Sequence, residues 1–147
     1  MSLHTTHLVV RLVHVLAMAV ALGGSALLWP ALARGPPRLA TEGVRTAAAV
    51  SYERLFWAAA GVLVTTGVGN LGAFGGALPR GDWGAVFALK LLGVVVGLPA
   101  SAVRTLLVAR YREAEGPLLA RPLAVAYAAT TVWLGGLVVL AEVLAHG

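Results

Sequence analysis

The chain of 147 residues contains no cysteine, and only 12% of its residues are charged. The absence of cysteine excludes disulfide bonds and sites in which thiolates hold zinc, iron or copper. Six acidic residues against eleven lysines and arginines leave a net charge of +5, and Lys90 is the only lysine. Hydrophobic residues make up 59% of the chain. A water-soluble domain of this size does not tolerate such a balance on its surface, so we expect a membrane protein.

Four long apolar runs occupy most of the sequence. Each is long enough to cross the ~30 Å hydrocarbon core of a bilayer, which needs about 20 helical residues. Leu, Ala and Val repeated over such lengths favour helices over the alternating pattern of a barrel strand. The first run exceeds the apolar stretch of a secretory signal, so we expect it to remain in the membrane. The sequence predicts an all-α integral membrane four-helix bundle of up-and-down topology, a single domain over 1–147 with helices at about 8–32, 55–77, 83–108 and 123–145.

Arginine placement predicts the orientation of this bundle. The second connection, residues 78–82, carries only Arg80, whereas the first and third connections are rich in arginine. The positive-inside rule then places the Arg-rich connections in the cytoplasm and both termini outside, in a bacterial-type inner membrane. This topology and the lipid phosphates account for the positive charge, and no soluble basic face suggests nucleic acid. The arginines in or beside the two connections are Arg34, Arg38, Arg45 and Arg54, and Arg104, Arg110, Arg112 and Arg121.

One face of the first predicted helix concentrates polar, metal-capable side chains. Spacings of three and four residues place them on a single stripe, which we expect to face partner helices rather than lipid. An ionisable residue inside a membrane segment is costly and marks a functional site by default. The stripe consists of His4, His7, Arg11, His14 and Met18.

The alternating helix directions bring further polar residues to the depth of this stripe. His14 and Lys90 each lie about 10 Å below the start of their helices, so we expect them at similar depth. Glu142 and His146, near the end of the last helix, belong to the same outer half of the bundle. Glu142 is a candidate ion-pair partner for Arg11 or Lys90.

These residue types leave two metal chemistries open. Imidazole and thioether groups spaced along one face suit copper moving through a row of sites. His7 and His14 are about 10.5 Å apart along the helix axis, so they do not clamp one haem between them. A haem would need His14 plus another helix, with Lys90, His146 or an open position on the other side of the iron. The candidate metal ligands are His4, His7, His14, Met18, Glu142 and His146, and the candidate haem-binding residues are His14, Lys90, His7 and Arg11.

Motifs spread over the whole chain resemble the CopD-like four-helix membrane domain, which is associated with copper import and copper resistance. They are Leu12-Val13-His14-Val15-Leu16 followed by Gly23-Gly24, Arg54-Leu55 leading into Val64-Thr65-Thr66-Gly67-Val68, and Leu89-Lys90-Leu91-Leu92 with a later Arg104. The chain is also similar to the HemJ-like protoporphyrinogen oxidases, which pair a histidine of the first helix with a lysine of the third. It departs from them where Trp29-Pro30-Ala31-Leu32-Ala33-Arg34 replaces a Leu-Pro-Arg-Leu segment with a nearby histidine.

We therefore expect a membrane protein that holds a copper ion or haem b, with copper handling preferred. A haem redox protein or enzyme is the alternative, and a structural or assembly subunit of a membrane complex is the third hypothesis. Gly93 and Gly97 form a Gly-x-x-x-Gly step, which most simply brings two helices of the bundle close together. The same step is a candidate surface for a homo-oligomer.

Overall fold

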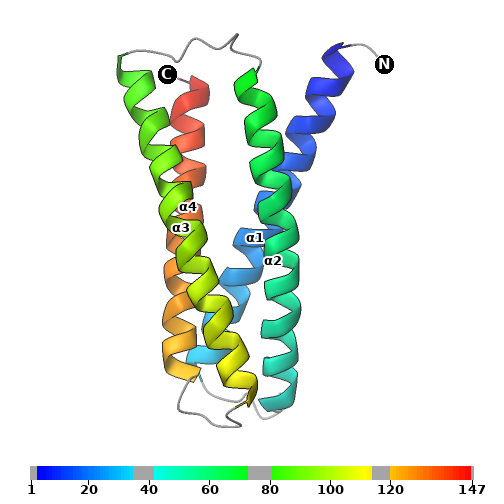
Figure 1. Cartoon of the computed structure of the whole chain (residues 1–147), viewed down its shortest axis with the longest axis vertical. Coiled ribbons are helices and arrows are strands. Elements are labelled where there is room, and N and C mark those ends of the chain that lie inside the picture. Colours follow the sequence, from blue (N-terminus) through cyan, green and yellow to red (C-terminus); the bar gives the residue numbers. More distant parts are fainter. Residues whose placement is uncertain (1–2, 35–41, 73–80, 114–119, 147) are drawn as a thin grey trace.

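A computed structural model describes residues 3–34, 42–72, 81–113 and 120–146, and within these ranges it contains four helices and no strand (Figure 1). The helices are α1 (Leu3–Ala33), α2 (Glu42–Gly72), α3 (Asp82–Glu113) and α4 (Ala120–His146). All four are long and apolar enough to cross a membrane, and α2 has the lowest mean hydropathy, 1.2 against 1.9 to 2.1 for the others. The expected all-α four-helix fold is confirmed.

The start of α2 differs most from the sequence-based boundaries. The helix begins at Glu42 rather than at residue 55, so Arg45 and Arg54 belong to it and not to a connection. The sequence-based boundaries place these arginines in a connection, but a helix tolerates charge on one face. Arg54 is exposed, whereas Tyr52 and Phe56, two residues away on either side, are buried. This charge also explains the low hydropathy of α2. The predicted last residues of this helix, 73–77, lie outside the described residues.

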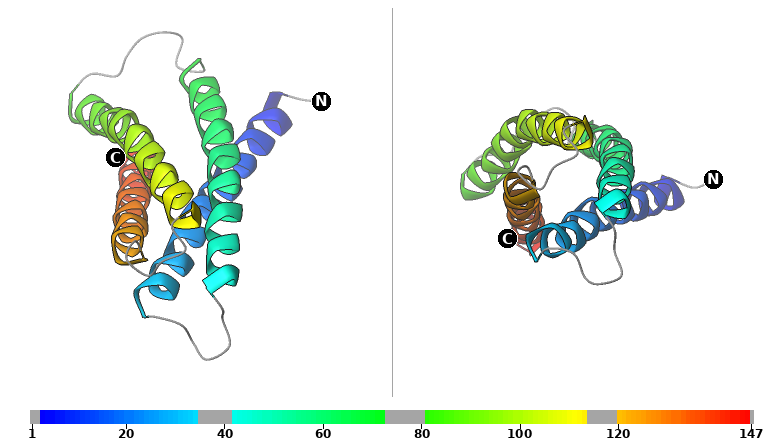
Figure 2. Two further views of the ribbon diagram at one scale, coloured as in Figure 1. Left: turned by 60° about the horizontal axis from the view of Figure 1, so that its bottom comes forward. Right: turned by 90° about the horizontal axis from the view of Figure 1, so that it is seen from below.

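The helices form a ring in chain order, with α1 diagonally opposite α3 (Figure 2). α1 packs on α2 and α4, α4 also packs on α3, and α2 and α3 have the slightest contact. Both chain termini lie at one end of the bundle, called the termini end below (Figure 1). The opposite end, where α1 and α3 finish and α2 and α4 begin, is called the arginine end. The alternating directions agree with an up-and-down topology with both termini on one side.

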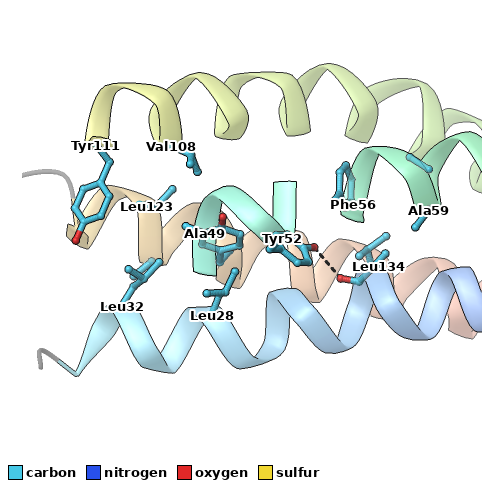
Figure 3. Packing of buried hydrophobic residues seen from close by; sticks show 14 of the residues in the cluster. Leu28, Leu32, Ala49, Tyr52, Phe56, Ala59, Val108, Tyr111, Leu123 and Leu134 are labelled. Carbon is cyan, nitrogen blue, oxygen red and sulfur yellow. Dashed lines mark hydrogen bonds between the residues drawn. The ribbon is translucent and has the colours of Figure 1, made fainter. Parts of the chain in front are cut away.

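The core lies in the half of the bundle toward the arginine end. Its largest side chains are aromatic: Tyr52 packs edge-on against Tyr127, with ring centroids 5.4 Å apart, and donates a hydrogen bond of 2.7 Å to the Ala21 carbonyl (Figure 3). Toward the termini end, α2 and α3 spread apart and the first part of α1 leaves α4 (Figures 1 and 2). Large apolar side chains of every helix point outward, as lipid contact requires, among them Leu27, Val68, Leu106 and Val132.

Two neighbouring glycines of α1 have different surroundings. A Cβ atom built on Gly24 would overlap ring carbons of Tyr52, whereas one built on Gly23 meets nothing within 4 Å. Gly24 therefore sets the distance between α1 and α2, because the Tyr52 ring lies directly on the helix backbone there. Gly23 has no such role.

We expect Gly24→Ala to destabilise the bundle by about 1–3 kcal/mol, because the added methyl group must displace the buried Tyr52 ring and its hydrogen bond to Ala21. Gly23→Ala is the matched control and should be neutral or stabilising by up to about 1 kcal/mol, since alanine is the better helix former. Thermal unfolding of both variants in the same detergent compares them. Equal unfolding midpoints would contradict this account of Gly24.

The Gly-x-x-x-Gly step of α3 is filled from within the chain. A Cβ atom on Gly97 would overlap the Trp133 indole of α4, and Trp133 Nε1 donates a 2.9 Å hydrogen bond to the Gly93 carbonyl. The step thus brings two helices of one bundle together, which is the simpler of its sequence-based interpretations. The homo-oligomer contact that the motif also suggested stays a prediction.

Candidate functional site

His14 of α1 contacts α2 in the half of the bundle nearer the termini. Its Nδ1 lies 2.6 Å from the hydroxyl oxygen of Thr66. That hydroxyl also lies 2.6 Å from the Val62 carbonyl oxygen and 3.3 Å from that of Leu63, so in the tautomer with the proton on Nδ1 the ring donates to Thr66 and the hydroxyl donates to a carbonyl. The neutral ring then carries its lone pair on Nε2. Histidines that bind metals are commonly held in this way, with one ring nitrogen fixed by an acceptor and the other free to bind.

Two further predicted site residues, Lys90 and Met18, belong to the described part of the chain, and both side chains are half-buried. Lys90 lies on α3, which is diagonally opposite α1 in the ring, and its placement beside His14 stays a prediction from depth. Met18, one turn further along α1, packs against the hydrophobic core. His14, Thr66 and Met18, with Lys90 as the predicted contribution of α3, are called the His14 site below.

The outer part of the α1 stripe does not face partner helices, contrary to expectation. His7 and Arg11 are exposed, and only His14 and Met18 of the described stripe are half-buried. The reason is the divergence of α1 from α4 toward the termini end, which leaves the first turns of α1 uncovered (Figure 2). The side chain of His4 lies outside the described part of the chain.

Glu142 and His146 at the end of α4 pair with each other rather than with the His14 site. His146 Nδ1 is 3.2 Å from a Glu142 carboxylate oxygen, and both side chains are more than 70% exposed. Among the described residues, Glu142 therefore forms an ion pair with His146 and not with Arg11 or Lys90. Within the described ranges, no three His, Cys, Asp or Glu side chains gather as a metal-binding group.

A buried charged network that the sequence-based prediction missed joins α2, α3 and α4. Arg104 of α3 is 1% exposed, and its Nε and Nη2 donate to the two carboxylate oxygens of Glu53 on α2 at 2.8 and 3.2 Å. Its third nitrogen, Nη1, donates to Thr130 of α4 at 2.7 Å. The guanidinium also lies over the Phe56 ring, 4.3 Å from the centroid. All three nitrogens of Arg104 are thus satisfied.

The carboxylate of Glu53 is satisfied as fully as the guanidinium. Tyr127 donates to one oxygen at 3.0 Å, and the Thr105 hydroxyl lies 2.6 Å from the other. Trp57 Nε1 donates to Thr105 in turn, at 3.0 Å. A charge pair inside a membrane protein is tolerated when its polar atoms have partners, and every side-chain nitrogen of Arg104 and both carboxylate oxygens of Glu53 are hydrogen-bonded.

The sequence contained a signal for this network that the predicted boundaries hid. With the second helix starting at residue 55, Glu53 falls in a connection and Arg104 at the edge of another. Continuing the helical period backward from Phe56 puts Tyr52, Glu53 and Ala49 on the same buried face. A lone acid on an otherwise apolar face requires a buried cation, and Arg104 is the one arginine inside the third predicted apolar run.

Comparison of the chain with models of protein families, with characterised proteins and with solved structures finds no match.

Proposed function

We propose that this chain is a membrane protein that binds a metal through Nε2 of His14, and that its function is the handling of copper. The observation that carries the proposal is the hydrogen bond between His14 and Thr66, which fixes the ring and leaves Nε2 free. A fixed second nitrogen both orients a ligating histidine and raises its basicity.

The donor set around His14 suits copper. Met18 lies one helical turn away on the same face of α1 and offers a thioether, and imidazole with thioether is a combination that copper accepts. The CopD-like motifs include His14, Thr66 and Lys90, so the resemblance covers both members of the hydrogen bond between His14 and Thr66. With the Arg-rich connections in the cytoplasm of a bacterial-type inner membrane, the His14 site opens to the outer side, and exposed His7 precedes it on α1.

A second candidate, a b-type haem protein, is favoured by the position of Lys90. At the depth that the sequence predicts for both Lys90 and His14, an ammonium group repels a bare metal cation but attracts a haem propionate. In this case His14 is the axial ligand and Lys90 binds the propionate or supplies the second ligand. Haem bound there would supply one-electron redox chemistry, which His14 tunes through the hydrogen bond to Thr66.

We expect His14→Ala to abolish binding of copper, measured by elemental analysis and by titration of purified protein with copper. His146→Ala removes an exposed histidine that pairs with Glu142, and it should bind as the wild type does. Thr66→Val keeps the shape of the side chain but removes the acceptor for Nδ1, so affinity should fall about 10–100-fold. A wild-type protein that neither holds nor gains copper would refute the copper function.

An absorption spectrum before and after dithionite separates the two candidates. A Soret band in the wild type indicates the haem protein if it is lost in His14→Ala. Neither copper nor haemin should restore the band in that variant. A colourless wild type that stays unchanged on addition of haemin excludes it.

A further inference from the structure

Arg45, in the first turn of α2, is a second buried guanidinium, and two of its nitrogens have no partner. The residue is 9% exposed, and its Nε and Nη2 are buried without a hydrogen bond. Arg104, by contrast, has every nitrogen bonded to protein oxygens. Burying an unpaired charged donor costs free energy, and native structures satisfy nearly all such groups. The Arg45 guanidinium therefore requires an anion.

The start of α2 adds to the attraction for an anion. Arg45 itself belongs to the first turn of α2, and helical side chains generally lean toward the helix N-terminus. The first N–H groups of a helix lack partners within the helix and form the positive end of its dipole. A guanidinium fork matches the oxygens of a phosphate, and phosphate is a group that helix N-termini bind.

No ion pair among the described side chains includes Arg45, and the side chain of Glu42, three residues before it on α2, lies outside the described part of the chain. The described ion pairs are Arg104 with Glu53 and His146 with Glu142. Glu113, an acid at the arginine end, is exposed, and the other described arginines at this end are exposed as well: Arg34, Arg110, Arg112 and Arg121. The arginine end is thus a positively charged surface with one buried, incompletely bonded guanidinium.

A separate groove between α1 and α4, whose lining does not include Arg45, lies at the same end and favours a lipid as the source of the phosphate. Trp29, Leu32 and Val125 supply apolar lining, and Arg121 lies among them. An acyl chain fits the apolar lining, whereas a free phosphate ion gains nothing from it. Basic pockets between membrane helices on the arginine-rich side are typical sites for anionic headgroups.

We propose that the arginine end binds the phosphate group of an anionic phospholipid, held by the Arg45 guanidinium and the N–H groups of the first turn of α2. This site lies at the opposite end of the bundle from His14 and does not depend on copper or haem. It gives the protein a lipid requirement of its own.

The test measures binding of phosphatidylglycerol to the full chain in phosphatidylcholine nanodiscs, by native mass spectrometry of retained lipid and by the shift of the unfolding temperature. Arg45→Gln should weaken binding about tenfold or more, because it removes the charged donors to the phosphate. Arg110→Gln removes the same charge from an exposed position at the same end and should change binding less than about threefold. Arg45→Lys keeps the charge but not the fork, and should fall between the two.

If Arg45→Gln fails to fold, lipid binding by the wild type alone still tests the proposal. No preference of the wild type for phosphatidylglycerol over phosphatidylcholine would overturn the proposal. So would equal losses in Arg45→Gln and Arg110→Gln, because they indicate a general charge effect. Inorganic phosphate is titrated against chloride at constant ionic strength, and stabilisation by phosphate without a preference for the anionic lipid would overturn the lipid assignment.

Discussion

Replacing Arg104 by methionine lowers the stability of the bundle by about 3–5 kcal/mol, the largest effect that we expect from any single substitution outside the His14 site. The reason is the carboxylate left behind. Glu53 loses two of its donors and stays buried between helices, with only Tyr127 and Thr105 to bond it. The measurement is equilibrium unfolding in mixed detergent micelles, where the population of folded protein is followed by far-ultraviolet circular dichroism.

The matched control stands next to Glu53 in the sequence. Arg54 is exposed on the opposite face of α2, so Arg54→Met should change the free energy of unfolding by no more than about 0.5 kcal/mol. If Arg104→Met and Arg54→Met are equally stable, the buried network does not hold α2 and α3 together. The comparison is sensitive because these two helices otherwise have the slightest contact of any adjacent pair.

A double substitution separates the network from simple packing. Glu53→Gln combined with Arg104→Met removes both charges, and the pair should be more stable than Arg104→Met alone, since no unpaired carboxylate remains. The coupling free energy between the two sites should reach about 1–3 kcal/mol. Additive losses would mean that Arg104 contributes through its contact with the Phe56 ring rather than through Glu53.

Helix number and direction followed from the sequence because each depends on properties of a single segment. Apolar length decides whether a helix can span the bilayer, and alternating spans fix which residues share a depth. The pairing of His14 with Lys90 rests on the same reasoning, a helical rise of about 1.5 Å per residue, and stays a prediction. The hydrogen bond from His14 to Thr66 adds a partner that depth alone did not select.

The orientation of side chains around a helix depends on the other helices, and there the sequence was insufficient. The stripe of His7, Arg11 and His14 has a single face, but α1 leaves α4 toward the termini end, so that face is covered only from His14 onward. The divergence of the helices also explains why Glu142 pairs with His146. Where the helix ends spread apart, the nearest partner of a charged side chain lies on the same helix. Divergence of this kind is a property of the whole bundle, and no local pattern encodes it.

Gly97→Ala tests the closest packing in the bundle and should destabilise it by about 3 kcal/mol. The added methyl group overlaps the Trp133 indole, a rigid ring that fills the Gly-x-x-x-Gly step and donates to the Gly93 carbonyl. Overpacking a core site costs about 1–3 kcal/mol, and displacing the ring adds the loss of its hydrogen bond. Thermal unfolding in one detergent measures the effect, which should appear as a lower midpoint.

Three further glycines of the same two helices show whether the cost comes from the ring. Gly93→Ala brings the new methyl group 3.0 Å from a Leu137 methyl group, which is the end of a flexible side chain, so its cost should be clearly smaller. Gly135→Ala and Gly136→Ala meet nothing within 4 Å and should be neutral or stabilising by up to about 1 kcal/mol.

A smaller ring at the partner position completes the argument about Gly97. Trp133→Phe withdraws part of the indole, so Gly97→Ala should cost less in that background than in the wild type, with a coupling of at least about 0.5 kcal/mol. If the cost is the same in both backgrounds, the methyl group acts on α3 itself and not on Trp133. In that case the Trp133 indole does not pack into the Gly-x-x-x-Gly step, and this face of α3 is available for another helix.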